Sequence, residues 1–341
     1  MIRGFATRSG CSRFAARFPV AQAAGFFRPA QDALLSTLGL GSYLGDLDEG
    51  TDRGYTNAAS AALRGGINLI DTSLNYRNQL SERALAPALK TVARDETVVC
   101  TKAGYLVPGA IPPGLPAGGV AGGTHSMEPA FLRHQLELSR ENLNLETIDV
   151  FYLHNPETQL RFVSPPEFYA RARAAFESLE SLAADGKIRY YGTATWDGYR
   201  RGAQPDALSL PRLVSLAREV AGDAHRFRFI QLPFNLGMPE ALTRALEGGV
   251  TVLDQARESG VTVIASASLL QARLARGLPP VVAEKIRGPR TDAQRAIQFT
   301  RSAPGITAAL VGMSQVEHVT ENLGVAAIPP AAPEEFALIF R

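Results

Sequence analysis

The sequence predicts a single closed (β/α)8 barrel of the TIM-barrel type, with an N-terminal extension and a long loop after the third strand. Eight short runs rich in β-branched residues alternate with helix-length amphipathic stretches, as expected of parallel βα units. The chain has 341 residues and 45% hydrophobic content, which suits one large barrel. No Pro/Gly-rich linker divides it.

The eight predicted strands are residues 37–43, 67–71, 97–102, 148–154, 188–194, 229–232, 261–266 and 306–311. The predicted helices are residues 55–63, 81–92, 128–143, 168–184, 210–220, 250–258, 291–301 and 316–323. Gly66 and Gly186 follow two of these helices, where glycine commonly ends a helix. We therefore expect an N-terminal extension over 1–36, the barrel over 37–324 and a C-terminal tail over 325–341.

An open doubly wound sheet is the alternative fold, and one stretch favours it. "LGLGSYLG" places Gly39, Gly41 and Gly45 in nearly the spacing of a dinucleotide-binding fingerprint. The third glycine of that fingerprint belongs where this chain has Leu44. A glycine-rich first βα turn of a barrel is therefore the favoured interpretation.

Composition excludes several classes of protein. The counts of 35 Lys+Arg and 33 Asp+Glu nearly cancel, so no broad basic field is present for nucleic acid. No apolar run is long enough to span a bilayer. The chain has only two cysteines, which argues against a disulfide framework and favours a cytoplasmic location. Histidines 125, 134, 225 and 318 lack ligand spacing, so no metal site is predicted.

The first thirty residues contain five arginines and no acid, a composition similar to that of a mitochondrial transit peptide. The same segment contains four phenylalanines that could instead pack an N-terminal extension against the barrel: Phe14, Phe18, Phe26 and Phe27. The packing interpretation is favoured.

A long loop is predicted over residues 105–123, "YLVPGAIPPGLPAGGVAGG". It has no periodicity and leaves the third strand at the barrel face where active sites lie. Loops of this length in compact domains are commonly functional, so we expect a lid over the site.

Polar residues end three successive strands: Asp71, Lys102 and His154, with Tyr76 just beyond the first. Adjacent parallel strands lie about 4.8 Å apart, so these side chains are predicted to meet at the barrel mouth. Singly, each has a structural explanation, as a helix cap, a packed ring or a core histidine. The next helix has a better cap in Ser81, however, and a buried Lys102 needs the charge of Asp71.

This constellation predicts acid catalysis by Tyr76. An ammonium about 4 Å from the phenol favours the phenolate by roughly 4 kcal/mol, which lowers the phenol pKa by about 3 units before burial opposes it. Tyr76 could then protonate a developing alkoxide. His154 is expected to donate a second hydrogen bond to the same oxygen.

The motifs "DTSLNY", "CTKAG" and "FYLHNP" resemble the catalytic tetrad of the aldo-keto reductases, in order and in barrel position. The resemblance extends through "YRNQLSERALAPAL", "IQLPFN" and "LVGMSQVEHVTENL", from about Leu38 to Leu323. It implies reversible hydride transfer between a nicotinamide cofactor and a small aldehyde or ketone or its alcohol. In that family pattern Tyr76 is the general acid, Lys102 and Asp71 tune it, and His154 orients the substrate.

The same resemblance implies a set of cofactor-binding residues: Gly41, Ser42, Tyr43, Thr195, Gln231, Ser266, Leu269, Gly312, Ser314, His318, Glu321 and Asn322. NADP(H) is the expected cofactor because it is the more frequent one in the family. NAD(H) is the alternative, because His318, a weaker phosphate partner, stands where an arginine can bind a 2′-phosphate. Arg273 or Arg276 could also reach a phosphate, although surface positions are the favoured interpretation.

Three positions depart from the family pattern. Ala194 and Thr195 replace two side chains that bind the nicotinamide amide, and Ser266 replaces an aromatic ring that stacks on it. Two other functions therefore stay open beside the oxidoreductase: a cofactor-sensing regulatory barrel, and a non-redox proton-transfer enzyme such as an eliminase or isomerase using the same tetrad.

Overall fold

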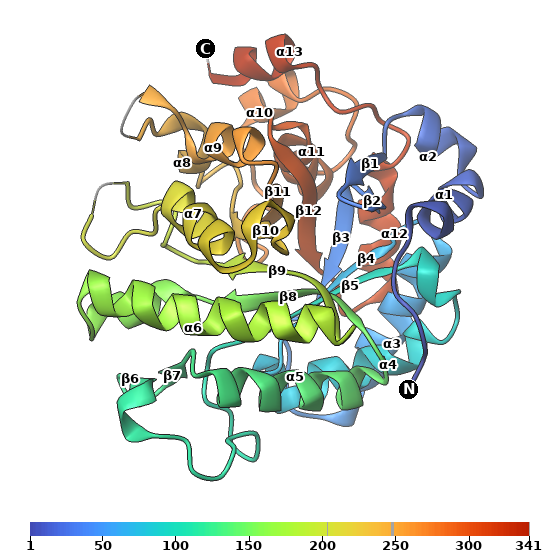
Figure 1. The fold of residues 1–341 in the computed structure, drawn as a ribbon. Coiled ribbons are helices and arrows are strands. Elements are labelled where there is room, and N and C mark those ends of the chain that lie inside the picture. The colour runs from blue at the N-terminus through green and yellow to red at the C-terminus, as the bar shows by residue number, and fades with distance from the viewer. Residues whose placement is uncertain (203, 247–248, 341) are drawn as a thin grey trace.

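Eight parallel strands form a closed barrel, which confirms the predicted fold (Figure 1). The computed structural model describes residues 1–202, 204–246 and 249–340. The strands, in barrel order, are β3 Leu38–Gly41, β4 Leu69–Asp71, β5 Val98–Ala103, β8 Ile148–His154, β9 Ile188–Ala194, β10 Phe227–Pro233, β11 Thr262–Ser266 and β12 Ile306–Gly312. β12 pairs with β3 and closes the ring.

Strand register brings the predicted site residues to one end of the barrel. Asp71 pairs with Cys100 across β4 and β5, and Lys102 pairs with Tyr152 across β5 and β8. His154 pairs with Ala194 on β9. Because all the strands run in the same direction, their carboxyl-terminal residues share one rim.

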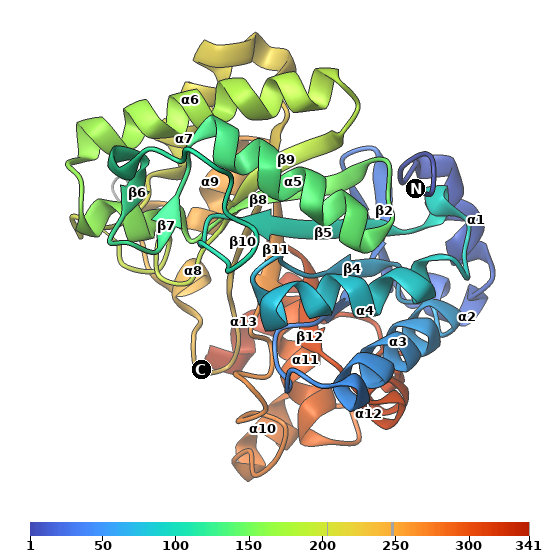
Figure 2. The same cartoon turned by 90° about the horizontal axis from the view of Figure 1, so that it is seen from below.

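The barrel is surrounded by helices that match the eight predicted helical patterns (Figures 1 and 2). They are α3 Glu49–Arg64, α4 Leu80–Leu89, α5 Pro129–Leu143, α6 Pro165–Ala184, α7 Leu210–Ala221, α9 Val252–Glu258, α11 Asp292–Ser302 and α12 Val316–Asn322. Three further short helices lack a sequence prediction: α8 Glu240–Thr243, α10 Pro280–Lys285 and α13 Pro333–Ala337. They are too short to produce a clear amphipathic pattern.

Ser81 does not cap α4, contrary to the sequence-based expectation. The helix begins at Leu80, so Ser81 lies inside it, and its hydroxyl donates to the carbonyl of Ser42 at 2.7 Å. This bond ties α4 to the loop after β3. Asp71 caps no helix either, because both of its carboxylate oxygens accept bonds from barrel side chains.

The first 36 residues fold as α1 Arg8–Ala16, α2 Pro19–Ala23 and an antiparallel hairpin of β1 Phe27–Ala30 and β2 Ala33–Ser36. They bond to the amino-terminal ends of barrel strands: Ala6 N–H donates to Asp149 at 2.7 Å, and Arg28 donates to the carbonyl of Ile306 at 2.7 Å. In both views this segment lies at the end opposite the β6 and β7 hairpin (Figures 1 and 2).

Aromatic packing holds this segment to the barrel. Phe14, Phe26 and Phe27 are buried in the same hydrophobic cluster as the barrel residues Leu38 and Ile70. The guanidinium carbon of Arg301, on α11, lies 5.6 Å from the centroid of the Phe26 ring. The packing role expected for these phenylalanines is therefore observed.

The loop after β5 contains a short hairpin, β6 Val120–Ala121 and β7 His125–Ser126. Val107 and Ala110 are buried against Leu74, beside the barrel mouth. Within the described ranges, no helix is both long and apolar enough to cross a membrane.

Candidate active site

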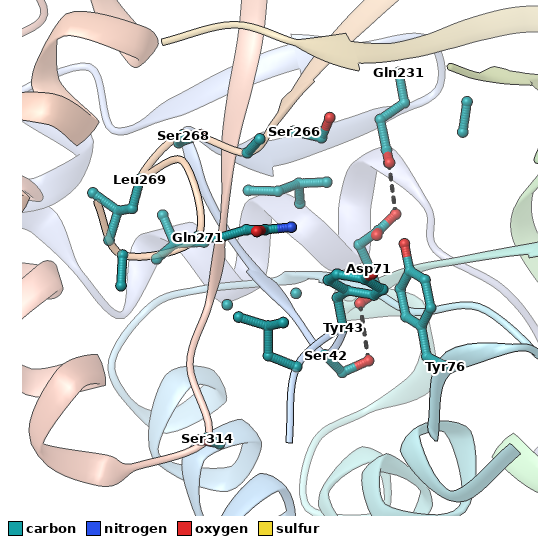
Figure 3. Close-up of a pocket in the computed structure, with 18 of the residues that line it drawn as sticks. Ser42, Tyr43, Asp71, Tyr76, Gln231, Ser266, Ser268, Leu269, Gln271 and Ser314 are labelled. Atoms are coloured by element: carbon teal, nitrogen blue, oxygen red, sulfur yellow. Dashed lines mark hydrogen bonds between the residues drawn. The ribbon is translucent and has the colours of Figure 1, made fainter. Parts of the chain in front are cut away.

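A cavity of about 890 Å³ opens at the carboxyl-terminal rim of the barrel. It is lined by Asp71, Tyr76 and His154, and by all twelve residues predicted to bind a cofactor. Lys102 lies behind this wall and is fully buried. Figure 3 shows Tyr43 and Tyr76 beside Asp71, with the loop carrying Ser268, Leu269 and Gln271 across the cavity.

Asp71 and Lys102 form a buried ion pair at the base of the cavity. Lys102 Nζ lies 2.5 Å from Asp71 Oδ1 and also donates to the carbonyl of Thr72 at 2.7 Å. Gln231 Nε2 donates to Asp71 Oδ2 at 2.8 Å (Figure 3). Burial would lower the pKa of Lys102, but Asp71 and Tyr76 raise it overall, so the ammonium is retained.

Tyr76 stands above this pair. Lys102 Nζ lies 4.9 Å from the centroid of the Tyr76 ring, and the ring packs edge-on against Tyr43 and His154, with centroids 5.0 Å and 5.7 Å away. Burial raises the pKa of Tyr76 above its ordinary value, and the opposing charge of Lys102 is the smaller effect. The lowering expected from the ammonium is present, but desolvation of the phenol exceeds it, so the net shift of the Tyr76 pKa is upward.

The turn that carries Tyr76 has an unusual backbone. Arg77, Asn78 and Gln79 have φ values of 49°, 52° and 74°, a run of left-handed residues without a glycine. Each costs about 1 kcal/mol or more relative to a right-handed conformation.

Arg77 anchors this turn from beneath. Its buried guanidinium donates to the carbonyls of Asp46 and Asp48 at 2.7 and 3.3 Å, and to the Asp52 carboxylate at 2.8 Å. These bonds hold the turn against the loop after β3, which supplies Tyr43 to the cavity.

His154 is held on two sides. Its Nδ1 lies 3.1 Å from Ser73 Oγ, and its backbone carbonyl lies 2.8 Å from His125 Nε2. Burial, reinforced by the charge of Lys102, lowers the pKa of His154 well below its ordinary value, so the imidazole is neutral. Gly104 permits this packing, because a Cβ there would lie 2.7 Å from His125 Nε2.

The loop after β9 is held by a buried carboxylate. Glu157 Oε1 accepts backbone hydrogen bonds from Trp196, Asp197 and Gly198 at 2.9, 3.1 and 3.1 Å. Trp196 lines the cavity and is 39% exposed. Three converging N–H groups therefore fix the segment that places Thr195 and Trp196 on the cavity wall.

The segment after β11 forms the opposite wall. Ser266 to Ala275 contributes most of it, and Ala267, Leu270, Gln271 and Ala272 have positive φ. Asn235 does not reach the cavity; its Nδ2 donates to the carbonyl of Ala267 at 2.9 Å and steadies this segment. From the 105–123 loop only Tyr105 lines the cavity, so the expected lid is not formed there, and the β11 segment occupies that place instead.

The far end of the cavity gathers the last predicted residues. Gly312, Ser314, His318, Glu321 and Asn322 line it together. Arg276 also lines the cavity, whereas Arg273 does not. Arg276 is therefore the arginine that the cavity wall presents.

Part of the chain matches a known protein family. Residues 37–201 match the model of the Aldo/keto reductase family. The match covers 165 of the 341 residues of the chain, just under half of it.

Two curated relatives resemble parts of the chain. A D-threo-aldose 1-dehydrogenase from Pseudomonas sp is 33% identical over 39% of this chain and 41% of its own length. An NADH-specific methylglyoxal reductase from Escherichia coli K12 is 30% identical over 49% of this chain and 50% of its own length. These matches span about half the length of the relatives or less.

The fold similarity extends further than the sequence similarity. An aldo/keto reductase from Klebsiella pneumoniae, solved in complex with NADP and acetate, superimposes with a TM-score of 0.64 at 21% identity. It covers 91% of this chain and 92% of its own. The likeness establishes the barrel fold over nearly the whole chain.

Several residues of this candidate site carry no prediction from the sequence. They are Leu44, Asn75, Asn155, Trp196, Ser268, Gln271 and Ala272 on the cavity wall, and His125 and Glu157 behind it. Those on the wall sit in loops adjoining predicted motifs, so proximity to a motif was the available signal. His125 and Glu157 gave none, because their partners lie far along the chain.

Proposed function

We propose that this protein is a nicotinamide-dependent oxidoreductase that interconverts a small aldehyde or ketone and its alcohol, with Tyr76 as the general acid and base. The observation that carries the proposal is the position of Tyr76, on the cavity wall and 4.9 Å from a buried Lys102 that is paired with Asp71. The names of the two curated relatives, an aldose dehydrogenase and a methylglyoxal reductase, support a small carbonyl compound as substrate.

The cavity fits a dinucleotide. Its volume of about 890 Å³ lies in the upper range of ligand pockets. A Cβ built on Gly312 would meet no atom within 4 Å, so the backbone there borders open space. Ser268 lines the cavity as well, although its own Oγ is enclosed away from it.

NADP(H) is the proposed cofactor, supported by the Klebsiella complex and by the presence of Arg276 and His318 on the cavity wall. NAD(H) stays the alternative, since one relative is named as NADH-specific. Ser266, Thr195 and Gln231 would surround the nicotinamide. One hydrogen of Gln231 Nε2 is already bonded to Asp71, so its carbonyl oxygen and the second Nε2 hydrogen are left for a ligand.

The bound cofactor would supply or receive the hydride, and the protein residues would manage the proton and the geometry. In the reducing direction Tyr76 donates its phenolic proton to the substrate oxygen. The raised pKa of Tyr76 keeps that proton in place at neutral pH. Lys102 then stabilises the phenolate, and Asp71 keeps Lys102 charged and fixed. His154 lies beside Tyr76 and orients the substrate.

Replacing Tyr76 by phenylalanine tests this role. We expect Tyr76→Phe to lower kcat for carbonyl reduction by at least a hundredfold, the usual contribution of a general acid, with an unchanged circular dichroism spectrum. Tyr169→Phe is the matched control, because it removes a phenolic hydroxyl from a residue that does not line the cavity. Reduction that survives Tyr76→Phe would reject the proposal.

Cofactor binding separates the proposal from non-redox chemistry. Trp196 is the only tryptophan and lines the cavity, so its fluorescence reports ligands there. We expect saturable quenching by NADPH, by NADH or by both. No change with either cofactor would favour the eliminase or isomerase alternative. Saturable binding without turnover on any carbonyl compound would favour a regulatory barrel.

A further inference from the structure

The hydroxyl of Ser73 sits at the centre of a small polar network behind His154. Ser73 Oγ lies 2.6 Å from Asn75 Oδ1, 3.3 Å from the carbonyl of Lys102 and 3.1 Å from His154 Nδ1. A serine hydroxyl has one proton to donate and can accept two hydrogen bonds. Two of its three neighbours are oxygens that only accept. The direction of this single proton therefore decides whether Nδ1 of His154, the third neighbour, carries a hydrogen.

The shortest contact takes the proton. The 2.6 Å separation from Asn75 Oδ1 is a good O–H···O distance, whereas 3.3 Å to the Lys102 carbonyl is long. Once the Ser73 proton points to Asn75, the contact with His154 is a hydrogen bond only if Nδ1 carries the hydrogen. The neutral imidazole then has a lone pair, and no hydrogen, on Nε2.

We propose that Asn75, acting through Ser73, holds His154 in the Nδ1–H tautomer, so that Nε2 accepts a hydrogen bond from a hydroxyl group of the ligand. Asn75 and Ser73 are positioning residues in this account. The sense of the bond is opposite to the donor role expected for His154 from the sequence.

This inference rests on the proposed function and adds a preference to it. Tyr76 and His154 both line the cavity, with ring centroids 5.7 Å apart. The phenol of Tyr76 is a donor in the reducing direction, and Nε2 of His154 is an acceptor. A matching ligand presents an oxygen acceptor and a hydroxyl donor close together, which describes a hydroxy-substituted carbonyl compound.

A second histidine provides an internal reference of opposite tautomer. His125 Nε2 lies 2.8 Å from the His154 carbonyl, which only accepts, so this nitrogen carries the hydrogen. His125 Nδ1 then accepts from Gln159 Nε2 at 3.1 Å. Of these two adjacent buried histidines, His154 therefore carries its hydrogen on Nδ1 and His125 carries its hydrogen on Nε2.

Nitrogen-15 NMR of histidine-labelled protein tests the tautomers without any turnover. Long-range proton–nitrogen spectra distinguish protonated from unprotonated ring nitrogens, and the missing signals in His154→Gln assign His154. We expect a protonated Nδ1 for His154 and a protonated Nε2 for His125. A protonated Nε2 on His154 in the wild-type protein would overturn the inference.

Substitution of Asn75 tests its control of the tautomer. Asn75→Leu removes the acceptor at similar size and frees the Ser73 proton for His154 Nδ1, so we expect the His154 signals to shift towards the Nε2–H form. Asn75→Asp keeps an acceptor oxygen and should preserve the wild-type pattern. His125 should stay unchanged in both variants, which reports an intact fold. If Asn75→Leu does not fold, Asn75→Ala replaces it. Unshifted His154 signals in a folded Leu or Ala variant would reject the role of Asn75.

Turnover tests the preference separately. We expect wild-type protein to favour 2-hydroxypropanal over propanal in kcat/KM by about tenfold, the value of one hydrogen bond, and Asn75→Leu to lose that preference. Equal preference in the two proteins would overturn the ligand assignment. Absence of turnover on any carbonyl compound would count against the proposed function instead, while the NMR result would still decide the tautomer.

Discussion

The ammonium nitrogen of Lys102 lies 2.5 Å from Oδ1 of Asp71, and the side chains of this pair are 0% and 6% exposed. Few ion pairs in the described part of the chain are so fully enclosed. The pair therefore sets the charge beneath Tyr76, and substitutions in it measure how much the ion pair contributes to the stability of the protein.

Breaking this pair should destabilise the protein strongly. Lys102→Met leaves a carboxylate buried without its cation, and Asp71→Asn leaves a buried ammonium. We expect each to lower the free energy of unfolding by about 3–5 kcal/mol in urea titrations. The double variant should recover part of this loss, because no charge is left unpaired, while remaining inactive. Additive losses in the double variant would argue against a coupled pair.

Buried His125 should make stability depend on pH. Burial lowers the pKa of His125 from 6.5 to about 4, so below pH 6.5 the unfolded chain binds a proton that the folded chain does not. This contribution is present above pH 6.5 and is lost as the pH falls towards 4. By pH 5 the stability lost through this residue amounts to about 2 kcal/mol.

Comparing the wild type with His125→Gln isolates the contribution of His125 to the pH dependence of stability. We expect the free energy of unfolding of the variant to fall less between pH 7 and pH 5. His225, whose pKa is also lowered to about 4, is present in both proteins and cancels. Parallel losses in the two proteins would show that His125 titrates normally in the fold.

Glu157 should control the position of Trp196. Glu157→Leu removes the acceptor of three backbone N–H groups, each of which costs about 1–3 kcal/mol when left buried and unpaired. Glu157→Gln retains an oxygen acceptor of the same shape. We expect a large loss of stability and an altered Trp196 emission in the Leu variant, and small changes in the Gln variant. Equal effects of the two substitutions would contradict the role assigned to the acceptor oxygen.

The N-terminal segment should contribute to the stability of the barrel. Phe14 is fully buried among other aromatic rings, so Phe14→Ala should cost about 3–5 kcal/mol. Val20, in the same segment, is 68% exposed, and Val20→Ala should change stability by at most about 0.5 kcal/mol. A Phe14→Ala effect as small as the Val20→Ala effect would imply that residues 1–36 fold independently of the barrel.

The barrel and the tetrad were predictable because they follow from strand ends. Asp71, Lys102 and His154 each close a run of apolar residues, and parallel strands bring such ends to one rim whatever the loops do. Five of the twelve predicted cofactor residues reached the cavity for the same reason, since they end or directly follow a strand: Gly41, Ser42, Thr195, Ser266 and Gly312.

What escaped prediction depends on contacts far apart in the sequence. His125 and Glu157 are placed by partners on other elements, and no local pattern reports those contacts. The net pKa shift of Tyr76 was also missed, because it depends on how deeply the ring is enclosed as well as on its neighbour's charge. The 105–123 loop resembled a lid by composition, yet its apolar residues pack beside the mouth.

The backbone run from Arg77 to Gln79 stores conformational energy directly beside the reacting phenol. Glycine at Asn78, the exposed member of the run, would relax the chain there without removing the Arg77 anchor, and would favour a more stable protein. The same relaxation would remove the constraint that aims Tyr76 into the cavity. Thermostability and turnover are therefore expected to trade against each other at this turn, which makes it a poor choice for stabilising substitutions and a good one for probing how much rigidity the reaction requires.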